Sequence, residues 1–244
     1  MRFQPNPGLM SGKLVDAAAF PGETFDLNVP EMIGDVAQIA TAFGRIDWIE
    51  WAPGYWTCAA QSAGECSYEV SMVLTHDTAD IRIRLTNDSN RVWEHGTAFN
   101  HFAADYPAPG GDYETARHWL RVSGQFRRLH DLSRKYSSRP GIQLFNVVGA
   151  PPVSQIPFAN SFQATPDFTA EGWLAVQSRD GTCLIAIVSK PALFLFQNSE
   201  FNCIHSAPDF GKLVPGQMSE TQTRIYIVQS SLKDWYKRMR DELF

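Results

Sequence analysis

Long apolar runs and clusters of basic residues are both absent from the sequence. No apolar run approaches the ~18 residues that cross a bilayer, so we expect no membrane partner. No basic run exceeds two residues and the net charge is −5. Because nucleic-acid-binding surfaces carry clustered positive charge, we expect no nucleic-acid partner. The start, MRFQPNPGLMSGK, lacks the apolar segment of a signal peptide. We therefore expect a cytoplasmic protein, or a secreted one whose leader has been removed.

Cysteine is also scarce. The four cysteines do not match the spacing of a metal finger: they are Cys58, Cys66, Cys183 and Cys203. Cys58 and Cys66 flank the segment AAQSAGE and could face each other across a hairpin, and a disulfide between them would be expected in a secreted form. We expect free, partly buried thiols instead.

Histidines offer only a weak metal pattern, because neither H-x-H nor H-x-x-x-H occurs. Residues six apart on a straight strand lie about 20 Å apart. His95 and His101 therefore cannot share one ion unless Gly96 bends the chain. Zinc needs three or four convergent ligands, so we predict no cofactor and no metal ligands. A divalent metal held through histidines remains the alternative.

The composition is sufficient for a sizeable core. Hydrophobic residues make up 44% of the 244 residues, and aromatic residues 12%. No linker, internal repeat or low-complexity segment divides the chain. We predict a single β-sandwich domain over residues 1–244.

Alternating apolar residues predict most of the strands. Segment 67–88 alternates on both sides of a polar turn, which is typical of an antiparallel hairpin with one solvated face. Segment 171–189 repeats this pattern around Asp180-Gly181, a strong hairpin turn signal. Its second half is almost wholly apolar and predicts a central, doubly buried strand. Segments 192–197 and 223–229 add two further strands.

The remaining segments are predicted from weaker signals. Segment 113–136 fits a helix or a hairpin whose tip is VSG, and we favour the hairpin because Gly124 would cost a helix about 1 kcal/mol. Segment 31–43 is expected to be a helix. Regions 1–30 and 137–170 carry many Pro, Ser and Asn residues, so we expect long loops there.

The tail from 231 is the clearest helix in the sequence. Ser231 can cap its first turn, with Asp234 three residues later. An apolar stripe then follows: Leu232, Trp235, Tyr236 and Met239. The sequence as a whole therefore predicts an antiparallel β-sandwich closed by a C-terminal helix.

The segment RVWEHGTAFNHFAADYP, residues 91–107, combines titratable groups with aromatic rings. Read as a strand, it places His95, Thr97, Phe99 and His101 on one face and the even-numbered residues Glu94, Ala98, Asn100 and Phe102 on the other. Dense polar groups among rings suit a ligand with hydroxyls and an apolar face, such as a sugar. The alternative is a well-networked structural segment.

His205 lies in a similar segment, NSEFNCIHSAPDFG. We take His101, His205 and Glu200 as candidate catalytic residues. Candidate substrate-binding residues are Asn100, Glu94, Trp93, Tyr106, Trp119, Arg121, Arg127 and Asn202. The two arginines would hold the carboxylate of an acidic sugar. His76 and His118 are interpreted as structural.

Several short motifs lie within residues 65–230. Thr86, Asn87 and Ser89 form a T-N-x-S motif, and Asn100 and His101 form a later N-H motif. Glu200 with Asn202 loosely fits a further E-x-Q motif, and a lead into a final strand follows: Leu213, Pro215 and Gly216. In these motifs the chain resembles the galactose-mutarotase-like sugar enzymes. The resemblance implies a β-supersandwich fold and a carbohydrate held on one concave sheet.

One departure from that family bears on the reaction. The family uses a second histidine, well downstream of the first, as general acid, whereas no histidine lies between His130 and His205 here. His205 would have to serve from a different strand. The sequence thus leaves two hypotheses: an enzyme that performs acid–base chemistry on a sugar (epimerisation, elimination or hydration), or a non-catalytic carbohydrate-binding module.

Overall fold

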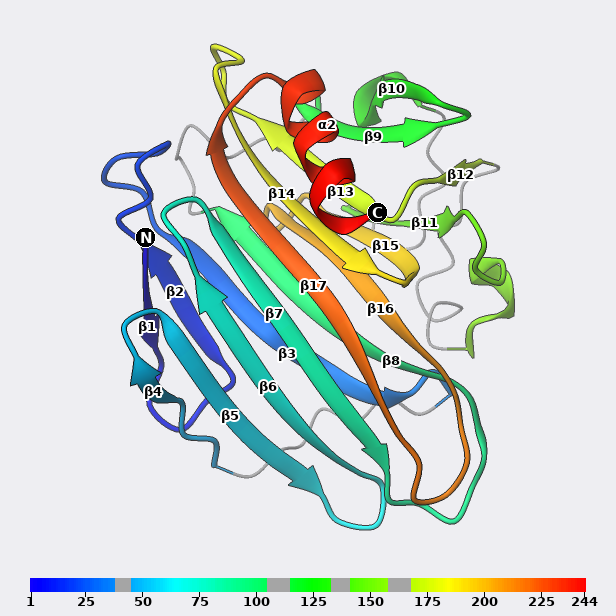
Figure 1. The fold of residues 1–244 in the computed structure, drawn as a ribbon. Helices are drawn as coiled ribbons and strands as arrows, with labels where there is room; N and C mark the ends of the chain where they lie inside the picture. Colours follow the sequence, from blue (N-terminus) through cyan, green and yellow to red (C-terminus); the bar gives the residue numbers. More distant parts are fainter. Residues whose placement is uncertain (38–44, 105–114, 133–140, 158–167) are drawn as a thin grey trace.

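The computed structural model describes residues 1–37, 45–104, 115–132, 141–157 and 168–244. Seventeen strands form one continuous hydrogen-bonded network that folds into two facing layers (Figure 1). Every pairing is antiparallel except that of β11 with β12. None of the helices in these residues is long and apolar enough to cross a membrane.

The first layer carries the candidate site. Its strands lie in the spatial order β1 (Arg2–Pro5), β2 (Ser11–Val15), β3 (Phe25–Asp35), β8 (Trp93–Ala104), β16 (Cys203–Leu213), β15 (Ala192–Asn198) and β11 (Ile142–Val147). β8 is central, because it pairs with β3 on one side and β16 on the other.

The second layer supports the helix. Its strands follow the order β4 (Ile49–Ala52), β5 (Tyr55–Ser62), β6 (Cys66–Leu74), β7 (Thr78–Asn87), β17 (Met218–Gln229), β14 (Cys183–Lys190), β13 (Trp173–Gln177), β9 (His118–Val122) and β10 (Gln125–Arg128). The short β12 (Thr169–Ala170) pairs with both β11 and β9 and so joins the layers. Two 3-10 turns cover Leu129–Asp131 and Val153–Gln155.

The main core fills the space between the layers. Every second residue of the long strands points into it, including Phe25, Leu27, Ile81, Ile83 and Phe102, and each of these is at most 1% exposed. Burying one such side chain contributes about 1.5–3 kcal/mol. The predicted hairpins at 67–88, 171–189 and within 113–136 are all confirmed, the last with its tip at Ser123-Gly124.

The C-terminal helix α2 (Leu232–Leu243) is confirmed and packs on the outer face of the second layer (Figure 1). The hydroxyl of Ser231 accepts a hydrogen bond from the backbone N–H of Asp234, as expected for an N-cap. Trp235 and Met239 are fully buried against the strands. The apolar stripe of this helix therefore forms a separate small core outside the sandwich.

Two predictions from weak patterns are wrong in the described residues. The predicted helix at 31–43 is the end of β3 as far as Asp35, where Met32 pairs with Phe99 and Ile33 with Ala98; residues 38–43 lie outside the described residues. Regions 1–30 and 137–170 are not plain loops, since they contain β1, β2, most of β3, β11 and β12. Pairing with distant strands overrides the local composition in both cases.

The four cysteines are free and buried. Cys58 pairs with Val70 in the ladder, while Cys66 pairs with Ser62, so the two cysteines do not face each other across the hairpin. The expectation of free thiols is confirmed.

Candidate functional site

A cavity of about 690 Å³ opens on the outer face of the first layer. This size lies within the range of small-molecule sites, ~300–1,000 Å³. Strands β2, β3, β8, β15 and β16 contribute its walls, and the segment between β15 and β16 contributes part of its rim. Three of the predicted residues from different parts of the chain line it together: His101, Glu200 and His205.

The alternation of β8 decides which of its residues reach this cavity. Phe99 and His101 point outward and line it. Asn100, between them, points into the sandwich, where its Nδ2 donates a 2.9 Å hydrogen bond to Oγ1 of Thr223 on β17. Thr223 also bonds to Ser189 at 2.8 Å. Asn100 therefore ties the two layers together, and its predicted place beside His101 in the cavity is wrong.

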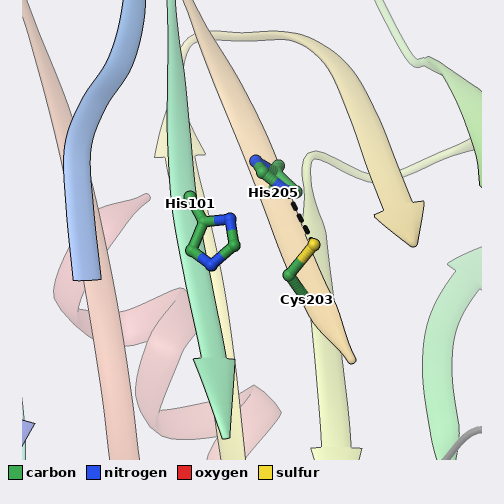
Figure 2. Close-up of side chains that lie close together, drawn as sticks. All are labelled: His101, Cys203 and His205. Carbon is green, nitrogen blue, oxygen red and sulfur yellow. Dashed lines mark hydrogen bonds between the residues drawn. The ribbon is translucent and has the colours of Figure 1, made fainter. Parts of the chain in front are cut away.

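His101, Cys203 and His205 form a compact cluster at the floor of the cavity (Figure 2). The strand register places His205 of β16 directly opposite His101 of β8, and their ring centroids are 5.0 Å apart in an edge-to-face arrangement. Cys203 precedes His205 by two residues and so shares its face of β16. Its Sγ lies 3.1 Å from Nε2 of His205.

His205 is the most deeply buried titratable group of the cluster, at 1% exposure. Phe99 stacks on its ring at a centroid distance of 4.1 Å, and Phe196 meets it edge-on at 4.9 Å. Burial lowers the pKa of His205 well below its usual value, the nearby His101 lowers it further, and the backbone of Asn100 offsets part of the effect. The imidazole is therefore neutral at physiological pH.

Two carboxylates from other elements line the same cavity. Oε2 of Glu31 on β3 lies 3.7 Å from Nδ1 of His101, which is an ion-pair distance rather than a hydrogen bond. The side chain of His101 is 19% exposed, so it can meet a ligand. Glu200 is exposed at the rim and packs against Gly141, where a Cβ atom would come within 2.6 Å of its Cγ.

Asn202 lines the cavity, but its side chain supports the backbone. It is 5% exposed, and its Nδ2 donates to the carbonyl oxygen of Ala104 at 3.3 Å. Its φ of 49° lies in the left-handed region, where asparagine is tolerated better than most residues. Asn202 thus shapes the turn that presents Glu200 and Phe201 to the rim.

The two predicted residues at the start of β8 lie away from the cavity. Trp93 is 1% exposed, and its Nε1 donates to Oγ of Ser89 at 3.1 Å. Glu94 is exposed and pairs with Lys212 at 3.0 Å. Trp93 belongs to the core and Glu94 to the surface, so neither lines the cavity with His101.

The β9–β10 hairpin, with three more of the predicted residues, lies in the second layer beside α2 (Figure 1). Arg121 pairs with Glu171 at 2.7 Å and stacks on the ring of Tyr236. Trp119 lies under the guanidinium of Arg128, and Arg127 is exposed on β10. These three residues therefore do not line the cavity with His101, and Tyr106 lies outside the described residues.

Cys203, Glu31 and Phe201 are among the cavity residues that sequence reasoning missed. Cys203 shares a face with His205, and the C-x-H spacing on a strand was the signal for this pair. Glu31 lay inside the segment predicted as a helix. Phe201, 69% exposed at the rim, supplies an aromatic surface there. The described lining residues include phenylalanines but no Trp or Tyr, contrary to our expectation.

Comparison with known proteins finds no matching family model and no matching curated protein. Solved structures do match. A galactose mutarotase-like protein from Lactobacillus casei ATCC 334 is 12% identical, with 93% of this chain and 97% of that chain covered and a TM-score of 0.47. An aldose epimerase homologue from C. elegans is 10% identical, with 77% and 69% covered and a TM-score of 0.44.

A xanthan lyase from Paenibacillus is 6% identical, with 97% of this chain and 26% of that chain covered and a TM-score of 0.46. Several of the similar structures are thus of the galactose-mutarotase-like kind that the sequence motifs resemble. At these identities the likeness concerns the fold alone. The function has to follow from the side chains of the cavity.

Proposed function

We infer that the protein is a carbohydrate-active enzyme that moves protons on a bound sugar, with the cavity of the first layer as its active site. One observation carries this inference: a partly exposed histidine, a buried neutral histidine and two carboxylates converge on one cavity of small-molecule size. General acid–base groups placed in this way contribute about 10²–10⁴-fold each.

His101 is the group best placed to exchange a proton with a sugar. Its ring is open to the cavity, and Glu31 faces its Nδ1, which favours Nε2 as the working nitrogen. Glu200 at the rim would supply the opposite acid or base. His205 packs edge-on behind His101, and its neutral ring would hold His101 in place without adding a second positive charge.

The charges of the cavity favour a neutral sugar over an acidic one. Its described lining residues include the carboxylates of Glu31 and Glu200, and also Asp26, which pairs with Lys13 at 3.2 Å; none of the described lining residues is Lys or Arg. Removal of a proton next to a uronic acid carboxylate requires a group that neutralises that carboxylate. Epimerisation or ring opening of a neutral sugar is therefore the reaction that we propose, ahead of elimination or hydration.

The test is turnover on a panel of neutral aldoses and ketoses, followed by NMR of the anomeric and C2 protons. Wild-type protein should accelerate interconversion of at least one sugar. His101→Gln should lower kcat by about 100-fold or more. His76→Gln is the matched control, because the side chain of His76 is 83% exposed in the β6–β7 turn, and it should leave kcat unchanged.

A non-catalytic carbohydrate-binding module is the second candidate, and the exposed ring of Phe201 at the rim favours it. A module would bind a sugar without changing it, and both His101→Gln and Phe201→Ala would weaken affinity with no rate to lose. Saturable binding without interconversion of any sugar on the panel would contradict the enzyme and support the module.

A further inference from the structure

We propose that His101, Cys203 and His205 form a binding site for a divalent transition-metal ion, zinc by preference, with one coordination position open to the cavity. This inference does not depend on the proposed function, because metal binding can be measured without a sugar. It rests on the register of two strands, the separation of the three donor atoms and the surroundings of the cluster.

The fold brings the three side chains together on regular backbone. Cys203 and His205 are two residues apart on β16 and so point the same way, and His205 is paired with His101 across the ladder. The residue opposite Cys203 is Ala103, whose small side chain leaves space in front of the sulfur. Sites carried on strands hold their ligands more rigidly than sites on loops.

One pair of donor atoms is already close to tetrahedral spacing, and the third atom lies near them. Zn–S bonds of ~2.3 Å and Zn–N bonds of ~2.0–2.1 Å separate the ligand atoms of a tetrahedral site by about 3.3–3.6 Å. In this cluster the three donor atoms all lie within 4.8 Å of one another, and Nε2 of His205 lies 3.1 Å from Sγ of Cys203. Side-chain rotations that move the atoms by about 1 Å would complete the geometry.

Imidazole and thiolate are both ligands of zinc, and catalytic zinc sites combine three protein ligands with a water or substrate oxygen in the fourth position. Here that position would face the cavity, which His101 also lines. Zinc binding would transfer the thiol proton of Cys203 to solvent and form a Zn–S bond, so charge and atoms balance.

The groups that surround the three side chains also fit a metal site. Oε2 of Glu31 lies 3.7 Å from Nδ1 of His101, and a carboxylate behind a ligating imidazole fixes its orientation. Phe99 and Phe196 enclose the ring of His205, which keeps water from one side. Nε2 of His205 lies 3.1 Å from Sγ of Cys203, so this nitrogen is the one that would meet an ion.

Coordination would occupy the histidine nitrogens on which the proposed proton transfer depends. The metal-bound protein would instead polarise a sugar oxygen at the open position. Metal binding is therefore tested by its own readouts, so that its failure and the failure of sugar turnover are distinguishable.

The experiment is a titration of chelator-treated protein with Co²⁺, read by absorption, and with Zn²⁺, read by calorimetry. Wild-type protein should bind one ion per chain and show a thiolate-to-cobalt charge-transfer band. Cys203→Ser should lose that band and bind Zn²⁺ more than about 100-fold more weakly. This effect is larger than the one expected for loss of a residue that only contacts a ligating side chain. Glu31→Gln should weaken binding by about 10–100-fold and retain the band.

Cys183→Ser is the matched control, because Cys183 is also a buried, free thiol but lies on β14 of the other layer. It should keep both the band and the affinity. His101→Ala provides a second test, since this side chain is partly exposed and its removal spares the core; it should weaken Zn²⁺ binding as Cys203→Ser does. Absence of one-to-one binding in the wild type, or a band that survives Cys203→Ser, overturns the proposal.

Discussion

Replacement of His205 by phenylalanine should remove a specific part of the pH dependence of stability. Burial holds the pKa of His205 well below its ordinary value of 6.5. As the pH falls below that value, the unfolded chain takes up a proton that the folded chain does not, so the free energy of unfolding falls toward acid. Phenylalanine keeps a ring of similar size beside Phe99 and has no proton to bind.

The expected loss of unfolding free energy corresponds to the uptake of one proton by the unfolded chain. With an unfolded pKa of about 6.5 and a much lower folded pKa, the loss between about pH 7.5 and about pH 5.5 is about 1.4 kcal/mol. Carboxylates with lowered pKa values, such as Asp77 and Glu220, lose their stabilising effect at still lower pH and do so equally in both proteins.

The assay is urea unfolding of chelator-treated protein at several pH values. His205→Phe should lose about 1.4 kcal/mol less than the wild type over this pH range. His76→Gln, which changes an exposed histidine, should follow the wild type. Parallel loss of stability in the wild type and in His205→Phe would refute the view that His205 is held neutral by burial.

Three further predictions concern other parts of the chain. Gly141→Ala should lower turnover of the sugar but not stability, because the new Cβ would displace Glu200, whose Cγ lies 2.6 Å away; unchanged kcat/KM would contradict a role for Glu200. Trp235→Ala should cost about 3–5 kcal/mol in urea unfolding, since this ring of α2 is fully buried against the second layer, and a loss below ~1 kcal/mol would contradict that packing. Burial raises the pKa of Cys58 to about 12, so this thiol should react with a disulfide reagent only in denaturant; its rapid labelling in the native protein would contradict the structure.

Local patterns in the sequence were sufficient for the hairpins and the helix. Alternation over 67–88 and 171–189, with a turn between the two halves, requires only neighbouring residues to pair. The C-terminal helix carries its own cap at Ser231 and its own apolar stripe. The N-terminal strands lacked such signals, because β3 forms its ladder with β8, about 70 residues further along the chain.

The candidate site was likewise predictable only in part from the sequence. The sequence placed His101, His205 and Glu200 together on the strength of a family resemblance, and these residues line one cavity. Alternation showed that Phe99 and His101 share a face of β8 and that Asn100 lies on the other. It could not show which face meets the second layer, because each face of this central strand mixes apolar and polar residues.

Only the tertiary structure decided that question, through the hydrogen bond of Asn100 to Thr223 on the opposite layer. It also set the β8–β16 register, which places His205 beside His101 and brings Cys203 with it. A shift of that register by one residue would turn these side chains to the other face. Register between strands about a hundred residues apart depends on the packing of the whole sandwich, and no short segment of the sequence contains it.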